Sequence, residues 1–173
     1  GSGGRKINRT QMRVIGWGAT DVGRKRNHNE DSFLCNNDIA LYAVADGMGG
    51  HLGGERASRM AVDSVSEMLI GGEGKASCDP ELDLVECLKN ATIYANLAIH
   101  QRSQEDSRCA GMGATFTGAA IRGDSLDLVQ IGDSRGYIIR KDHIRLATKD
   151  QSLVQQLVDV GQLGRAELPV LLR

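Results

Sequence analysis

The stretch at residues 43–51 constrains this chain more than any other: AVADGMGGH is an apolar segment that ends in a carboxylate and a glycine-rich turn. An aspartate at the end of a buried strand lies where the core meets water. The glycines after it allow backbone carbonyl groups to come close to whatever the aspartate holds. We interpret the polar segments at 26–31, 53–58 and 132–135 as parts of one site around Asp46.

The composition is that of one soluble globular domain. The chain has 173 residues, 40% of them hydrophobic and 25% charged, and this is enough for a core. A net charge of −1 and an aromatic content of 3% argue against nucleic acid as a partner. No apolar run approaches the roughly 20 residues of a membrane span, and no signal peptide opens the chain, so we expect no membrane partner.

The spacing of the four cysteines bears on the cellular compartment in which the protein is expected. No pair has CxxC spacing, so we expect neither a zinc site nor a disulfide scaffold but reduced thiols in a cytoplasmic protein. The four are Cys35, Cys78, Cys87 and Cys109.

Periodicity predicts an α+β fold in which antiparallel sheets are covered by helices. Residues 1–12 are polar and are expected to be a flexible segment before a domain at 13–173. Apolar spacing predicts one helix over 53–69 and another that starts at Asp79-Pro80-Glu81 and ends near 102. A third is expected over 150–160. Strands are predicted at 14–20, 32–35, 39–45 (buried on both faces), 114–121, 125–131, 136–140 and 143–147.

Four carboxylates lie at strand ends or turns beside glycine or serine: Glu30, Asp31, Asp46 and Asp133. Carboxylates, backbone carbonyls and water are the ligands that Mg²⁺ and Mn²⁺ prefer. Two such ions about 3.5–4 Å apart can activate a water and hold a phosphoryl group. Arg26 could supply the bidentate fork that a phosphate prefers. Taken singly, each of these residues is explained as well by a turn or a solvated loop.

Their order along the chain removes that ambiguity. The sequence closely resembles the metal-dependent Ser/Thr protein phosphatases of the 2C type, in their bacterial form, over about residues 14–163. The segments that carry this resemblance are RNHNED at 26–31, DGMGGH at 46–51, MGAT at 112–115, GDSRGY at 132–137 and TKDQSLV at 148–154.

The resemblance implies a role for each site residue. Asp46 would bridge two catalytic metal ions, Mn²⁺ or Mg²⁺, and the Gly47 carbonyl would bind one of them. Glu30 and Asp31 would hold metal-bound waters or bind directly, Arg26 would grip the substrate phosphate, and Asp133 would belong to a third, weaker metal site. The implied reaction is the attack of a metal-bridged hydroxide on phosphoserine or phosphothreonine in a protein, without a phosphoenzyme intermediate.

The resemblance also implies an α-β-β-α sandwich of antiparallel sheets flanked by helices. The family pattern continues with an Asp-Gly strand and a Gly-x-Asp-Asn segment, but the only Asp-Gly here is Asp46-Gly47, and neither motif follows Asp133. We therefore expect a partial domain, incomplete at its C-terminus, with open sheet edges through which copies could associate.

Two functions remain open on this basis. The chain could belong to a phosphatase that acts on a phosphorylated protein, such as a Ser/Thr kinase or the targets of one. Alternatively, it could be an inactive phosphatase-like module that binds a phosphoprotein or a partner domain.

Overall fold

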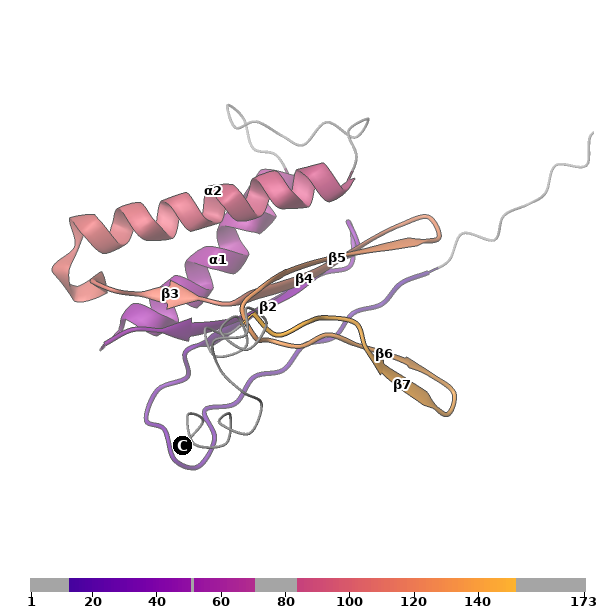
Figure 1. The fold of residues 1–173 in the computed structure, drawn as a ribbon, viewed down its shortest axis with the longest axis horizontal. Coiled ribbons are helices and arrows are strands. Elements are labelled where there is room, and N and C mark those ends of the chain that lie inside the picture. Colours follow the sequence, from indigo (N-terminus) through magenta and orange to yellow (C-terminus); the bar gives the residue numbers. More distant parts are fainter. Residues whose placement is uncertain (1–12, 51, 71–83, 152–173) are drawn as a thin grey trace, which may run out of the picture.

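The computed structural model describes residues 13–50, 52–70 and 84–151 (Figure 1). Its strands are β1 (Asp31–Asn36), β2 (Leu41–Met48), β3 (Gly113–Ala114), β4 (Phe116–Arg122), β5 (Ser125–Ile131), β6 (Tyr137–Arg140) and β7 (His143–Leu146). Its helices are α1 (Gly53–Ile70), α2 (Leu84–Glu105) and the short 3₁₀ helix η1 (Ser107–Cys109). These elements confirm the α+β class.

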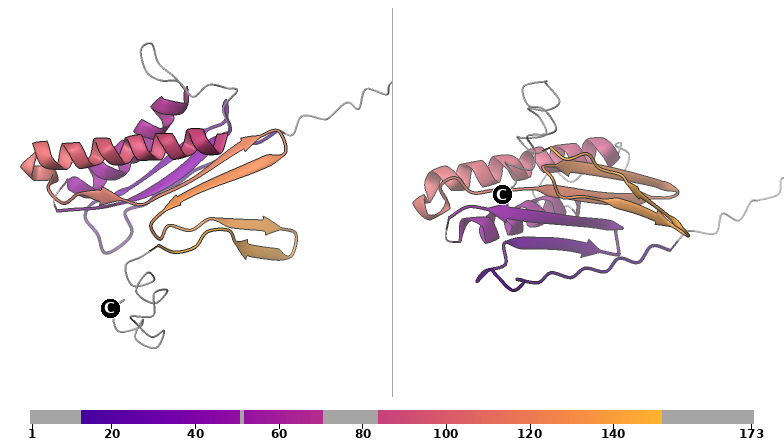
Figure 2. Two further views of the ribbon diagram at one scale, coloured as in Figure 1. Left: turned by 45° about the horizontal axis from the view of Figure 1, so that its top comes forward. Right: turned by 60° about the horizontal axis from the view of Figure 1, so that its bottom comes forward.

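The main sheet is antiparallel, in the order β1-β2-β4-β5, and β3 pairs with the end of β2. The second sheet, within the described residues, is the hairpin β6–β7. Figure 2 shows α1 and α2 together on one face of the main sheet, with the hairpin on the opposite side. We call these the helix face and the outer face. The layers observed are helix, sheet, sheet, which is the arrangement expected of the sandwich up to its last helical layer.

The core lies between the main sheet and the helices. Alternate residues of β2 point to the helix face and are buried, and they pack against small and branched side chains of α1 and α2. The main cluster consists of Ala43, Ala45, Ala61, Val62, Val65, Ala91, Ala95 and Phe116. Small residues at these positions let the helices lie close to the sheet.

The prediction that strand 39–45 is buried on both faces is wrong. Burial alternates along β2: Leu41 is 1% exposed and Val44 is 45% exposed. The apolar run could not show this, because Tyr42 and Val44 are apolar on a face that the helices do not cover. The strand also begins later and runs through Asp46 to Met48.

The predicted strand over 14–20 is also absent, because residues 13–20 are extended without pairing in a sheet. The segment lies across aromatic rings instead. A Cβ on Gly16 would overlap the ring of Tyr42, and one on Gly18 would overlap the ring of Phe33. The amide of Gly16 donates to Asn37 Oδ1 at 2.7 Å. The two glycines thus permit close packing on the outer face.

Two parts of the predicted helices lie outside the described residues. One is the helix start at 79–81. The other is most of the helix over 150–160; its first two residues, Asp150 and Gln151, are described and are not helical. The helix expected to end near 102 continues to Glu105, and η1 follows within the predicted polar link. The Asp106 side chain accepts a hydrogen bond from the Arg108 amide and so caps η1.

The expectation that all the thiols are reduced is wrong for Cys87, which is disulfide-bonded. Cys35 and Cys109 are free thiols. Spacing alone could not show this pairing. No described helix is long and apolar enough to cross a membrane.

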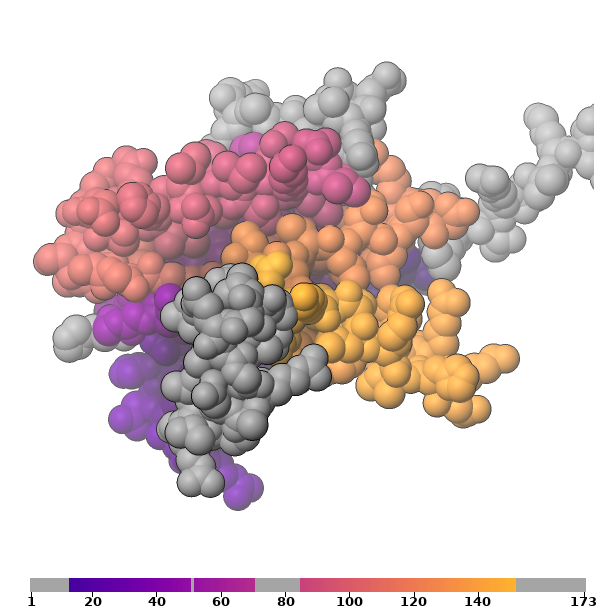
Figure 3. Space-filling model, in the orientation of Figure 1, coloured from indigo at the N-terminus to yellow at the C-terminus, as the bar shows by residue number. Residues whose placement is uncertain are grey.

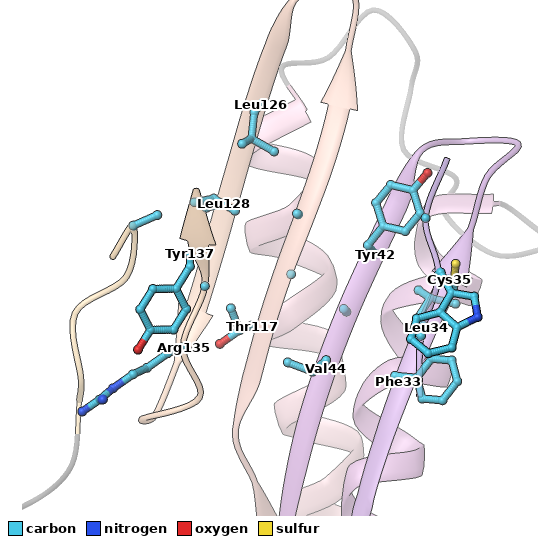
Figure 4. Close-up of a pocket in the computed structure, with 18 of the residues that line it drawn as sticks. Phe33, Leu34, Cys35, Tyr42, Val44, Thr117, Leu126, Leu128, Arg135 and Tyr137 are labelled. Carbon is cyan, nitrogen blue, oxygen red and sulfur yellow. The ribbon is translucent and has the colours of Figure 1, made fainter. Parts of the chain in front are cut away.

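The outer face is strongly apolar. Figure 4 shows Phe33, Tyr42, Val44, Leu126, Leu128 and Tyr137 around one cavity, with the helices behind the sheet. The volume of this cavity is about 320 Å³. In Figure 3 the hairpin and the helix layer form separate flanks of the molecule. The apolar surface between the main sheet and the hairpin is the interior of the predicted sandwich.

Candidate metal and phosphate site

The site begins with two carboxylates that face each other across β1 and β2. The strand register places Asp31 directly opposite Asp46. Because side chains alternate along a strand, both lie on the outer face, away from the buried Ala45. Like charges directly opposite each other destabilise a sheet. The strand register therefore brings two negative charges together, and a bound cation would stabilise this pair.

The electrostatics of Asp46 reflect this crowding. Partial burial raises the pKa of Asp46, and the neighbouring Asp31 carboxylate raises it further. Asp133 acts in the same direction, whereas the Arg26 guanidinium lowers the pKa of Asp46. Three of the predicted site residues, Arg26, Asp31 and Asp133, thus act on the carboxyl group of a fourth, Asp46.

Thr115 joins the end of β2 to the turn that carries Asp133. Its amide donates to the Asp46 carbonyl at 2.8 Å, and its hydroxyl accepts from the Asp46 amide at 3.0 Å. The same hydroxyl lies 2.6 Å from the hydroxyl of Ser134. Asp46 and the Asp133 turn are therefore held together by one side chain. Sequence analysis placed Thr115 in a motif but assigned it no role.

The turn at Gly132 is fixed from the other side as well. Gly132 has a φ of +93°, which favours glycine. The Gln151 amide donates to the Gly132 carbonyl at 2.9 Å. Beyond the turn, the Arg135 guanidinium binds both oxygens of the Asp150 carboxylate, at 2.9 and 2.6 Å. The turn therefore has a defined backbone path beside the carboxylate pair.

Gly47 lies at a close approach of β2 to the first turn of α1. Its amide donates to the Glu30 carbonyl at 3.0 Å. A Cβ on Gly47 would overlap the carbonyl oxygen of Gly54, and one on Gly54 would overlap the Glu30 carboxylate. Glu30 therefore rests against the first turn of α1, where the helix dipole favours a negative charge. The Glu30 carboxylate therefore contacts the start of α1, in addition to any role in metal binding.

Arg26 belongs to a loop, residues 20–29, whose two ends are joined. Asn29 donates from its side-chain amide to the Thr20 hydroxyl at 2.8 Å, and its Oδ1 accepts from the Asp31 amide at 3.0 Å. Within the loop, Asp21 accepts from the Gly23 amide at 2.7 Å. The loop is thus attached directly to the first residue of β1.

A cavity of about 380 Å³ lies between this loop and the strand ends. Asp21, Asp31, Asp46 and Ser134 contribute its polar wall, and Phe33 and Val44 contribute apolar surface. Ser134 belongs to the segment 132–135 that the sequence assigned to the site, although no role was predicted for its hydroxyl. Asp21 was not predicted as a site residue, because it is distant from Asp46 in sequence and lies in none of the motifs.

The residues present fit part of a divalent-cation site. The two adjacent carboxylates, Asp31 and Asp46, form a hard-oxygen donor set. However, within residues 13–50, 52–70 and 84–151, no group of three or more His, Cys, Asp or Glu side chains is arranged to hold a metal ion.

Solved structures define the class of protein. A Mycobacterium tuberculosis serine/threonine phosphatase, PstP/Ppp, superposes with a TM-score of 0.70 at 37% identity, over 85% of this chain and 59% of that one. A Staphylococcus aureus phosphatase, Stp1, gives a TM-score of 0.70 at 31% identity, over 86% of this chain and 58% of that one. The fold is that of bacterial Ser/Thr phosphatases.

Comparisons of the sequence identify the family to which the chain belongs. The protein phosphatase 2C family model matches residues 22–155. PstP of Mycobacterium tuberculosis is 38% identical over 148 residues, which are 86% of this chain and 27% of that protein. Stp of Listeria innocua is 34% identical over 151 residues, which are 86% of this chain and 59% of that protein. The chain belongs to the protein phosphatase 2C family, and it spans less than two thirds of these relatives.

Proposed function

We propose that this chain carries part of the active site of a metal-dependent phosphatase that hydrolyses phosphoserine and phosphothreonine in proteins. The observation that carries the proposal is the Asp31–Asp46 pair, which faces a cavity beside Arg26 in a member of this family. Uncompensated carboxylates at the end of a strand are costly for the fold, and a bound divalent cation would offset that cost.

Each site residue has a distinct task in this proposal. Asp31 and Asp46 hold Mn²⁺ or Mg²⁺ together with the Gly47 carbonyl, and Asp133 contributes to a further cation site. Arg26 binds the phosphate of the substrate through paired N–H groups. Glu30 holds the segment before β1 against the end of β2 and the first turn of α1, through its contacts with Gly47 and Gly54.

The proposed cofactor has support from a relative. The PstP catalytic domain has been solved in complex with two manganese ions, and it superposes on this chain with a TM-score of 0.70 at 37% identity. When bound, such ions polarise a phosphoryl oxygen and activate water for attack. The residues of this chain would hold the cations and orient the phosphate.

Hydrolysis of a phosphothreonine peptide tests the proposal. Turnover should require manganese or magnesium, stop when a chelator is added, and be lost in Asp46→Asn. Asp63→Asn, at an exposed position on α1, makes the same chemical change away from the site and should keep the activity. A folded protein that binds the peptide without turnover would instead support the phosphoprotein-binding module.

We also propose the setting in which the phosphatase works. Residues 13–173 form part of one phosphatase domain, and the segment expected at 1–12 lies outside the described residues. Its substrates include phosphorylated proteins such as a Ser/Thr kinase or the targets of one. The free thiols of Cys35 and Cys109 support a cytoplasmic location, although the disulfide at Cys87 does not.

Self-association is a separate proposal. The outer edges of β1 and β5 carry no paired strand among the described residues, and open edges can pair with a second copy. Sedimentation velocity across a range of protein concentrations tests this: a fast-sedimenting species that grows with concentration would support pairing, and a constant monomer would exclude it.

A further inference from the structure

We propose that the turn at Arg24 and Lys25 selects phosphopeptides with acidic residues beside the phosphorylated residue. This inference rests on the proposed function, because it concerns the peptide that surrounds the phosphate. It goes beyond that function, because it identifies a surface outside the metal and phosphate residues and the chemistry of the sequence that this surface recognises.

The first observation is the arrangement of charge in the loop at 20–29. Three cationic side chains follow one another, Arg24, Lys25 and Arg26, and all three are exposed. Arg26 acts on Asp46 by its charge, whereas Arg24 and Lys25 are not among the groups that shift the Asp46 pKa. Arg24 and Lys25 form no ion pair with any described residue. Their charges are therefore available to a partner.

The second observation is that the loop is held against the site. Its ends are joined by the hydrogen bond from Asn29 to Thr20, and Asn29 also accepts from the amide of Asp31. The bond from the Gly23 amide to Asp21 shapes the turn that precedes Arg24, with Gly23 at a φ of +75°. The basic turn is thus anchored to the first site carboxylate by a short, hydrogen-bonded path.

The third observation is the position of the loop at the cavity. Ala19, Thr20 and Asp21 form part of the cavity wall, as does Ser134. Figure 1 shows this loop, in purple, extending beyond the main sheet. Because Arg24 and Lys25 directly precede Arg26 in this loop, a peptide whose phosphate is bound by Arg26 comes within reach of their side chains.

The partner that fits this surface is an acidic phosphopeptide. Exposed ion pairs are individually weak, but two of them add a measurable preference and speed the approach of a negatively charged peptide. The cavity itself is lined by Asp21, Asp31 and Asp46, and these would repel an acidic flank placed inside it. The preference should therefore apply to acidic residues on one side of the phosphorylated residue.

The experiment measures the binding of peptides that carry a non-hydrolysable phosphonate in place of the phosphate, by fluorescence anisotropy with manganese present. Peptides with glutamate, lysine or neutral residues on either side of the phosphonate are compared. We expect the best glutamate peptide to bind about five- to tenfold more tightly than its lysine counterpart, with the ratio falling at high salt. In the double variant Arg24→Gln/Lys25→Gln the ratio should approach one.

Two further variants make the result decisive. Charge reversal, Arg24→Glu/Lys25→Glu, should invert the preference. Lys141→Gln/Arg145→Gln removes two exposed cations from the β6–β7 hairpin and should keep the wild-type ratio. Circular dichroism melts check that each variant folds.

The neutral-flank peptide separates the two proposals. Manganese-dependent binding of this peptide without any preference for glutamate overturns the role of the basic turn but leaves the proposed function standing. A preference that survives Arg24→Gln/Lys25→Gln also overturns that role. Failure to bind any of the peptides overturns both proposals.

Discussion

At the scale of single residues, the site works against the stability of the metal-free fold. Asp46 lies at the end of a strand whose previous residue, Ala45, is buried, and opposite another carboxylate. Functional carboxylates are commonly held in such positions because the cost of crowding them is what makes a cation bind. This crowding should therefore lower the stability of the metal-free fold, whether or not the protein is active.

Asp46→Asn should stabilise the metal-free protein at pH 7, by a few tenths to about 1 kcal/mol. The folded-state pKa of Asp46 is raised above 3.8, so its ionisation, as pH rises through that folded-state pKa, removes stability. The gain from the substitution should therefore be present at neutral pH and disappear below about pH 4. Thermal melts in chelator measure it, with Asp63→Asn as the control. A less stable Asp46→Asn protein at pH 7 would contradict this account of the site.

Gly47→Ala should weaken the fold by about 1–3 kcal/mol, because a Cβ there meets the backbone of Gly54 and neither segment can move freely. Gly50→Ala is the matched control, since a Cβ at Gly50 meets nothing within 4 Å. Denaturant unfolding compares the two. Equal stability of both variants would show that β2 and α1 do not approach as closely as described.

The order of the candidate site residues along the chain indicated that they lie together, but not what surrounds them. In the structure Arg26, Asp31 and Asp133 act on the carboxyl group of Asp46. The Thr115–Ser134 bridge was not predictable, because it joins two side chains 19 residues apart through the tertiary approach of two turns. The position of Glu30 against Gly54 depends in the same way on how α1 packs. The roles of these residues in metal and phosphate binding remain predictions.

At the scale of elements, long periodic segments were predictable and the faces of strands were not. The helix at 53–69 matches α1, and the four strands predicted after residue 113 match β4 to β7 within a few residues. The short strand β3, which pairs with the end of β2, was not predicted as a separate element. Burial of 39–45 was misjudged because hydrophobicity does not say which face another layer covers. The extended segment 14–20 packs on rings of Phe33 and Tyr42, a contact that no local pattern encodes.

The contact between β1 and α1 includes a buried pair of hydroxyls. Ser32 and Ser58 are 5% and 0% exposed, and their Oγ atoms lie 2.9 Å apart. Ser58→Ala should cost about 1–3 kcal/mol of unfolding free energy because it leaves the Ser32 hydroxyl without this partner. The double variant Ser32→Ala/Ser58→Ala should cost less than the sum of the single changes, since it removes both groups. A double-mutant cycle by denaturant unfolding measures this, and strictly additive costs would contradict the pairing.

The ion pair between Arg135 and Asp150 joins the start of β6 to the segment after β7. Arg135 lowers the pKa of Asp150 below 3.8, so the pair stabilises the fold above that value, and its contribution is lost as pH falls through the lowered pKa. Asp150→Asn should therefore be less stable than the wild type at neutral pH, by a small amount, and equal to it in strong acid. Hydrogen exchange of the β6–β7 amides reports the difference locally.

The matched control for this pair is Asp142→Asn, in the turn of the same hairpin. It should leave exchange in β6 and β7 unchanged at every pH. A wild-type advantage over Asp150→Asn that persists unchanged into acid would exclude the ion pair as its cause.

At the scale of the whole molecule, the described chain is a helix layer, a main sheet and one hairpin of a second sheet. Its outer face exposes large apolar side chains, among them Trp17, which is 87% exposed. The chain spans 59% of a solved relative. Among the described residues, two site carboxylates face each other, and no group of three His, Cys, Asp or Glu side chains is arranged to hold a metal ion.

The most direct test of the central claim is a manganese titration, followed by the electron paramagnetic resonance signal of free Mn²⁺. The account predicts binding by the wild type, and loss of that binding in both Asp46→Asn and Asp31→Asn, with Asp63→Asn unaffected. Manganese binding that is unchanged in Asp46→Asn, or absent in the wild type, would contradict the claim that this carboxylate pair is the cation-holding part of the site.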